Sequence, residues 1–208
     1  MEALWTRYLP QTSVIRQLLA DGVLGEPRSV LADHGQAIGA GPGHRLYEPA
    51  LGGGALLDLG VYPIQLSSMV LGAPSSVTAV GGLSESGVDA FSTLVLTHEH
   101  GAQSTLYSSM LERTPTTATI AGTEALVSVD GPFHTPSALT LTGAAHTSPS
   151  LRWEDPTGLR LFDGLSWQAT ALARFVGEGR LESPLHPLDE VVSIMSTIDM
   201  ARAQLGAV

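Results

Sequence analysis

Hydrophobic positions recur at helical spacing in three stretches of the chain. Residues 11–21 form the first, where Thr12 or Ser13 is the expected N-cap and Gly22 ends the pattern. Its apolar positions are Val14, Ile15, Leu18 and Leu19. Residues 165–177 and 188–205 repeat this periodicity, the latter directly after Pro187. Each pattern predicts an amphipathic helix.

Alternating apolar and polar positions predict β-strands elsewhere. Residues 28–34 alternate well, and six further runs are separated by glycine-rich or polar turns. These runs cover residues 76–81, 90–97, 102–111, 116–121, 125–130 and 138–142. We expect them to form an antiparallel meander. Residues 1–8 read as a short buried strand that Pro10 ends, and residues 36–51 and 144–162 read as loops.

One predicted strand is apolar on both faces. Phe91, Thr93 and Val95 alternate with Leu94 and Leu96. Helices can cover only one face of such a sheet, so the other face needs a second cover. We therefore expect an α+β fold, an open and predominantly antiparallel sheet with helices on one face and a homodimer or higher homo-oligomer contact on the other.

Composition narrows the classes of function. The 208 residues suffice for one core, so residues 1–208 are expected to form a single domain. A net charge of −10 without a basic cluster argues against nucleic acid as a partner, and the absence of cysteine excludes disulfides and thiolate zinc sites. No run approaches the ~20 consecutive apolar residues of a membrane span, and no signal pattern precedes the first helix. We expect no membrane partner and a cytoplasmic location.

The richest chemical pattern lies at residues 52–63, where three glycines lead into an apolar helical segment. Asp58 and Tyr62 are four residues apart, which places their side chains on one face of a helix, near its N-terminal end. This is the spacing of a paired carboxylate and proton donor. A plainer alternative is that Asp58 complements the helix dipole and Tyr62 is an ordinary half-buried aromatic residue. The helix should continue to Gly72, with a kink or restart at Pro63.

Two other patterns argue less strongly for a site. Residues 39–43 superficially resemble a dinucleotide fingerprint, but no strand precedes them and no helix follows at once. A loop over the site is the better interpretation. His98 and His100 share a strand face yet lack a third ligand, so no metal site is expected. Metalloprotease and serine-hydrolase motifs do not occur in the chain.

Three segments resemble the Gfo/Idh/MocA family of NAD(P)-dependent oxidoreductases. They are Trp5-Thr6-Arg7-Tyr8-x-Pro10, the stretch 52–63, and the closing segment 179–190. The match is to the C-terminal domain, in the branch with glucose-fructose oxidoreductase and dimeric dihydrodiol dehydrogenase, and it implies a glyceraldehyde-3-phosphate-dehydrogenase-like fold. The family's N-terminal Rossmann domain has no counterpart in the chain.

The resemblance also implies roles for particular residues. Tyr62 corresponds to the catalytic acid/base and Asp58 to a residue that orients the substrate or a lysine. The pocket for a small-molecule substrate, a sugar, polyol or diol, is lined in that branch at the positions of Trp5, Arg28, His34 and Phe162, although His34 stands where the branch tends to place an aromatic ring. The family's lysine comes from a Glu-Lys-Pro motif in the nucleotide-binding domain, and this chain contains no lysine.

The missing half leaves three interpretations open. The chain could be the substrate-binding and dimerisation domain of an oxidoreductase, a stand-alone binding or scaffold domain without catalysis, or one chain of a split enzyme. We favour the first, because Met1 begins in the middle of a family pattern. NAD or NADP is then expected in the complete enzyme, and no cofactor is expected on this chain alone because it lacks the fingerprint and the lysine.

Overall fold

The computed structural model describes residues 1–39, 43–145 and 147–208. Its strands form one sheet in the order β2-β3-β4-β1-β5-β6-β7-β8. The strands are β1 (Pro27–Gly35), β2 (Ser76–Leu83), β3 (Asp89–Thr97), β4 (Gln103–Ser109), β5 (Ala118–Gly122), β6 (Ala125–Val129), β7 (Ala138–Gly143) and β8 (Ser150–Glu154). The α-helices are α1 (Pro10–Ala20), α2 (Val61–Leu71), α3 (Leu165–Gly177) and α4 (Leu188–Leu205). The expected α+β class and the helices at 165–177 and 188–205 are confirmed.

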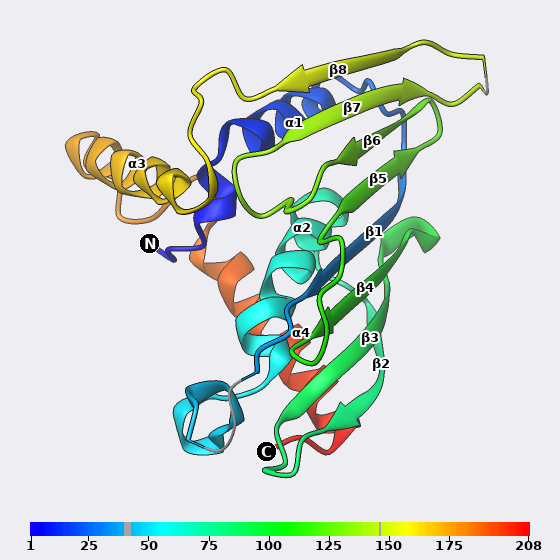
Figure 1. Cartoon of the computed structure of the whole chain (residues 1–208). Coiled ribbons are helices and arrows are strands. Elements are labelled where there is room, and N and C mark those ends of the chain that lie inside the picture. Colours follow the sequence, from blue (N-terminus) through cyan, green and yellow to red (C-terminus); the bar gives the residue numbers. More distant parts are fainter. Residues whose placement is uncertain (40–42, 146) are drawn as a thin grey trace.

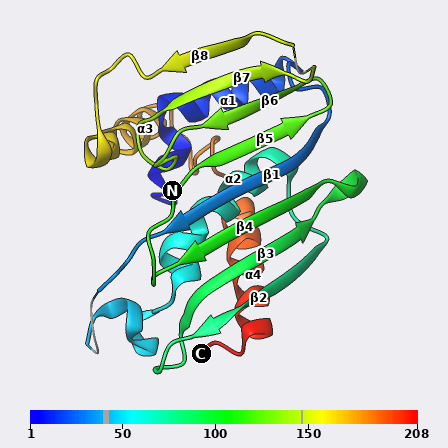
Figure 2. The ribbon, with the colours of Figure 1, turned by 45° about the vertical axis from the view of Figure 1, so that its right-hand side comes forward.

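Helices α1, α2 and α4 cover one face of the sheet, and α3 stands at its side (Figure 1). Figure 2 shows the sheet in front with these helices behind it. The core between the layers combines strand residues such as Val30 and Leu106 with Ile64 of α2 and Ile198 of α4. The opposite face of the sheet is open to solvent and carries the exposed apolar side chains Leu31, Val80, Phe91 and Val95.

The sheet is not a simple meander, because β1 lies between two antiparallel groups. β1 pairs in parallel with β4 and antiparallel with β5. The chain leaves β1, crosses the helical face through α2, and returns through β2 and β3 to place β4 beside β1 (Figure 1). Hydrophobic periodicity marks each strand but carries no information on this pairing.

The sequence prediction was wrong for residues 1–8 and for residues 150–154. Residues 1–8 do not form a strand: Trp5–Tyr8 is a buried turn of 3₁₀-helix that leads into α1. The N-cap of α1 is Leu9, not Thr12 or Ser13 as expected, and Pro10 is its first residue. A proline is well tolerated there because the first helical N–H has no intrahelical acceptor. Residues 150–154, expected to be loop, form the edge strand β8, since β7 supplies the hydrogen-bonding partner that they need.

The helix expected after Gly54 begins with a π-helical turn, Leu56–Gly60, and continues as α2. Its start is held by the buried Asp89, whose carboxylate accepts from the Leu56 N–H at 2.6 Å. Gly54 has φ +114, and a Cβ added there would lie 2.2 Å from Asp89 Oδ1, so only glycine fits. Gly72, at φ 77, ends α2 as expected.

The stretch Pro49–Leu71 is long and apolar enough to cross a membrane by length and composition, which the sequence analysis did not anticipate. Just over half of its most apolar window, 56%, is buried inside the fold. Core helices of globular proteins pass the same test, so this finding is weak evidence for a span.

Candidate functional site

A cavity of about 570 Å³ opens at the end of the sheet where β1 finishes. Five of the six predicted site residues line it: Trp5, His34, Asp58, Tyr62 and Phe162. They come from the N-terminal turn, from β1, from the π turn and α2, and from the segment before α3. The fold therefore brings together residues that are up to 157 positions apart in the chain.

Tyr62 lies in the first turn of α2 with its hydroxyl hydrogen-bonded to Trp5. The indole Nε1–H of Trp5 donates to the phenol oxygen at 3.1 Å. Burial raises the pKa of Tyr62, the Trp5 hydrogen bond lowers it in part, and the Asp58 charge raises it further. The phenol is therefore a protonated donor near neutral pH, and it needs an added cation to act as a base.

Asp58 sits in the π turn and is paired with Arg45. The Arg45 Nη2 and Asp58 Oδ1 atoms are 2.6 Å apart, and both residues line the cavity. The two opposite charges cancel, and because the pair is partly exposed its contribution to stability is modest. The sequence analysis did not identify Arg45. Its contact with Asp58 depends on the conformation of residues 43–51, which brings Arg45 next to the π turn.

His34 is buried, and both of its ring nitrogens are engaged. Nδ1 lies 3.2 Å from the Leu59 carbonyl, which only accepts, so Nδ1 carries the proton. Nε2 then accepts from the Gln36 amide at 2.9 Å. In an α-helix, the Leu59 carbonyl would accept a hydrogen bond from the N–H of residue 63. Residue 63 is a proline and has no N–H, so this bond is missing. Burial lowers the pKa of His34 to about 4, so the ring is neutral.

His134 is a site residue that the sequence analysis missed. Its ring centroid lies 4.2 Å from that of His34 and 4.8 Å from that of Tyr62, and it lines the cavity. Burial and the neighbouring His34 lower its pKa to about 3. His134 follows a turn after β6. β1 and β6 both pair antiparallel with β5, so both strands finish at the same end of the sheet. This shared end is the feature that could have identified His134.

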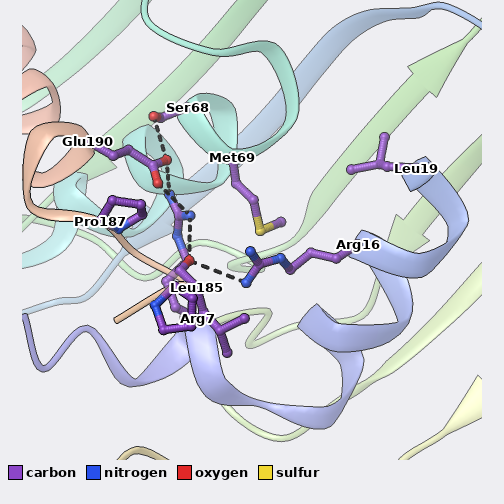
Figure 3. Close-up of a pocket in the computed structure, with 9 residues that line it drawn as sticks. Arg7, Arg16, Leu19, Ser68, Met69, Leu185, Pro187 and Glu190 are labelled. Carbon is purple, nitrogen blue, oxygen red and sulfur yellow. Dashed lines mark hydrogen bonds and ion pairs between the residues drawn. The ribbon is translucent and has the colours of Figure 1, made fainter. Parts of the chain in front are cut away.

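The turn that carries Trp5 is fixed by Arg7, whose guanidinium is buried beside a separate cavity of about 410 Å³ (Figure 3). Each of its five N–H groups has an acceptor: the side chain and carbonyl of Gln65, the Leu185 carbonyl, and both carboxylate oxygens of Glu190. Gln65 and Tyr62 lie on the same helix, three residues apart. The contacts of Arg7 with Gln65 thus hold Trp5 in register with Tyr62.

Phe162 and Arg28 differ in their relation to the cavity. The Phe162 ring stacks near-parallel to Trp5, with centroids 6.4 Å apart, and follows Leu161, whose φ of 46 is unusual for a residue with a side chain. Arg28 does not line the cavity. It pairs with Glu26 at 2.9 Å near the start of β1, six residues or roughly 20 Å from His34 along an extended strand. The resemblance assigned Arg28 to the pocket from its position in the sequence. Sequence position does not show which end of a strand lies at the pocket.

The sequence analysis considered His98 and His100 as metal ligands and residues 39–43 as a cofactor loop. His98 is buried, with Ser67, Ser104 and the Gly72 carbonyl as hydrogen-bond partners, while His100 lies exposed in the next turn. Among the described residues, no group of three or more His, Asp or Glu side chains could hold a metal ion. The loop at 39–43 falls partly outside the described residues, which leaves its expected position over the site untested.

Comparisons with known proteins place the chain in a family. Residues 12–128 match the family model of the GFO/IDH/MocA C-terminal domain. A trans-1,2-dihydrobenzene-1,2-diol dehydrogenase from Xenopus tropicalis is 33% identical over 214 residues, which cover 99% of this chain, and the human enzyme of that name is 31% identical over 208 residues. The chain spans 62% of the length of each of these relatives.

Solved structures share the fold at lower identity. An aldose-aldose oxidoreductase from Caulobacter crescentus, solved with glycerol, superposes with a TM-score of 0.80 at 22% identity, over 97% of this chain and 60% of that one. A 3-ketoreductase from Actinomadura kijaniata, solved with NADP, gives 0.77 at 24% identity, over 98% and 62%. By its match to the family model, supported by these relatives, the chain belongs to the GFO/IDH/MocA family of oxidoreductases.

Proposed function

We propose that this chain is the substrate-binding and dimerisation half of an NAD(P)-dependent oxidoreductase that acts on a sugar, polyol or diol. The observation that carries the proposal is the Tyr62 hydroxyl, which lies on a cavity also lined by Asp58, His34 and Trp5. A general acid must come within about 2.6–3.2 Å of the atom that it protonates, and a tyrosine on the cavity wall is placed where a bound substrate can approach it.

The chemistry divides between this chain and a second domain. When bound, NAD(P) supplies or accepts the hydride. In the reducing direction Tyr62 donates its proton to the carbonyl oxygen that becomes the hydroxyl. In the oxidising direction it must take up that proton as a phenolate, which its raised pKa opposes without a cation. Arg45 is already paired with Asp58 and the chain has no lysine, so we propose that the cation comes from the nucleotide-binding domain.

The open face of the sheet is the proposed dimer contact. Leu31, Thr105 and Val95 lie side by side on neighbouring strands of this face, and Leu31 and Val95 are exposed. An apolar surface of this kind is typical of a homodimer interface.

Reconstitution tests the proposal. The nucleotide-binding domain of a dihydrodiol dehydrogenase relative would be fused upstream of this chain or added in trans. The absorbance of the reduced nicotinamide cofactor would then be followed in the presence of sugars and diols. We expect turnover from the fusion and none from the chain alone, and Tyr62→Phe should lower the rate roughly 10²–10⁴-fold without unfolding the domain. Unchanged turnover in Tyr62→Phe would instead make Asp58 and Tyr62 architectural and favour the scaffold interpretation. Turnover from the in-trans mixture would favour a split enzyme.

A further inference from the structure

Two arginine side chains meet at the cavity of about 410 Å³, which shares no lining residue with the cavity at Tyr62. The Leu185 carbonyl accepts from Nη1 of Arg7 at 3.4 Å and from Nη1 of Arg16 at 3.2 Å. Figure 3 shows Arg16 extending from α1 towards Leu185 and Arg7. One carbonyl oxygen thus holds two guanidinium groups of like charge side by side.

The two guanidinium groups differ in how many of their N–H groups are used. All five N–H groups of Arg7 have acceptors, among them both carboxylate oxygens of Glu190. Arg16 donates to the Leu185 carbonyl, and its Nε and Nη2 atoms have no acceptor in the part of the chain that the structure describes. Arg16 therefore presents a free edge, Nε–H and Nη2–H, of the kind that binds both oxygens of a carboxylate.

The ionisable residues that line this cavity leave it positively charged, in a chain whose net charge is −10. Arg7 and Arg16 carry two positive charges, and Glu190 carries one negative charge that Arg7 and Ser68 already hydrogen-bond. Burial and the Arg7 charge lower the pKa of Arg16, and the Glu190 charge raises it, but a guanidinium remains protonated at neutral pH. An anion at Arg16 would offset the repulsion, and one net positive charge beside Glu190 favours a monoanion over a dianion.

Apolar side chains form much of the remaining wall. Leu19 lies three residues after Arg16 on α1, and Met69 points from α2 into the same cavity (Figure 3). The segment before α4 contributes Pro184 and Pro187, which have no backbone N–H to offer to a phosphate oxygen. The cavity thus combines a cationic edge with hydrocarbon surface, which suits a carboxylate that carries a short apolar chain.

We propose that this cavity binds a small monocarboxylate, with its oxygens on Nε–H and Nη2–H of Arg16 and its hydrocarbon chain against Leu19 and Met69. The site goes beyond the oxidoreductase function proposed above and does not depend on it. Because the ligand binds the folded chain, it should also stabilise that chain.

A titration of the full chain tests the proposal. Butyrate, acetate and inorganic phosphate would be added separately at neutral pH and constant ionic strength, and binding followed by ligand-detected NMR. We expect saturable butyrate binding with a dissociation constant on the order of 1 mM. Acetate should bind roughly ten-fold more weakly, because it lacks two CH₂ groups that the apolar wall would cover, and phosphate should also bind more weakly than butyrate.

Matched variants assign the binding to Arg16. Arg16→Met should weaken butyrate binding at least about ten-fold, the loss expected for a charge-assisted hydrogen bond. Arg16→Lys, which keeps the charge without the planar edge, should retain part of the affinity. Arg28→Met removes the same charge from an exposed ion pair on β1 that does not line this cavity, and should retain all of it.

Thermal unfolding gives a second measurement on the same proteins. Butyrate should raise the Tm of the unmodified chain and of Arg28→Met, and leave that of Arg16→Met unchanged. The proposal would be overturned by an absence of saturable butyrate binding or by phosphate binding more tightly than butyrate. Unchanged butyrate affinity in a folded Arg16→Met, or an equal loss in Arg28→Met, would also overturn it.

Discussion

The indole N–H of Trp5 donates to the Tyr62 hydroxyl at 3.1 Å, which joins the N-terminal turn to the helix that carries the candidate acid. This contact leaves the phenol proton free to point into the cavity. It also offsets part of the pKa increase that burial causes at Tyr62. Trp5 thus lines the cavity and is also the hydrogen-bond partner of the candidate acid.

Trp5→Phe should raise the pKa of Tyr62 further, because it removes the hydrogen bond that favours the phenolate. A spectrophotometric tyrosine titration of the variant, with Tyr62→Phe to assign the signal, measures the shift. A pKa that is unchanged or lower would contradict the contact. In the fused enzyme the same variant should slow oxidation more than reduction.

Arg7→Met should destabilise the domain by about 3–5 kcal/mol, because it leaves the partly buried Glu190 carboxylate without its partner. Thermal unfolding would show this as a fall in Tm on the order of 10 °C. The matched control is Arg28→Met, whose ion pair with Glu26 is half exposed and should contribute less than about 1 kcal/mol. Similar losses in the two variants would argue against the Arg7 network as the anchor of the turn.

Stability should fall on acidification, beginning below pH 6.5. His34, His134 and His186 have folded-state pKa values of about 4, 3 and 4, against 6.5 for the free side chain, with burial as the main cause. The unfolded chain binds more protons in this window, so stability is complete above about 6.5 and is lost as the pH falls towards 4. Denaturant unfolding at several pH values measures the slope.

Substitutions show which histidines cause this pH dependence of the free energy of unfolding. His134→Phe should reduce it by at most about 1.4 kcal/mol per pH unit, since one titrating group is removed. A stability that is flat between pH 7 and pH 4 would show that these rings are not held neutral.

Val95→Lys should dissociate the proposed dimer, because it places a charge in the middle of the open apolar face of the sheet. Sedimentation at micromolar concentration would show a dimer for the unmodified chain and a monomer for the variant. Val192→Lys, an exposed position on α4 away from that face, is the control and should remain dimeric. A monomeric unmodified chain would remove the basis for this interface.

The local pattern determined much of this protein. Apolar residues at helical spacing were sufficient to place α3 and α4, and glycine, proline and polar turns bounded most strands, because these signals act over a few residues. The spacing of Asp58 and Tyr62 also indicated that both would face the same region, and both line the cavity. Such features depend on backbone geometry that neighbouring residues dictate.

Only the tertiary structure decided the rest, since it depends on partners far away in the chain. β8 is a strand because β7 is beside it, and residues 5–8 form a buried turn because Arg7 finds Gln65 and Glu190. Arg28 and His34 share a strand, yet only His34 reaches the cavity. His134 became a site residue because the pairing of β1, β5 and β6 brings its loop to the end of β1, and no pattern along the chain encodes that pairing.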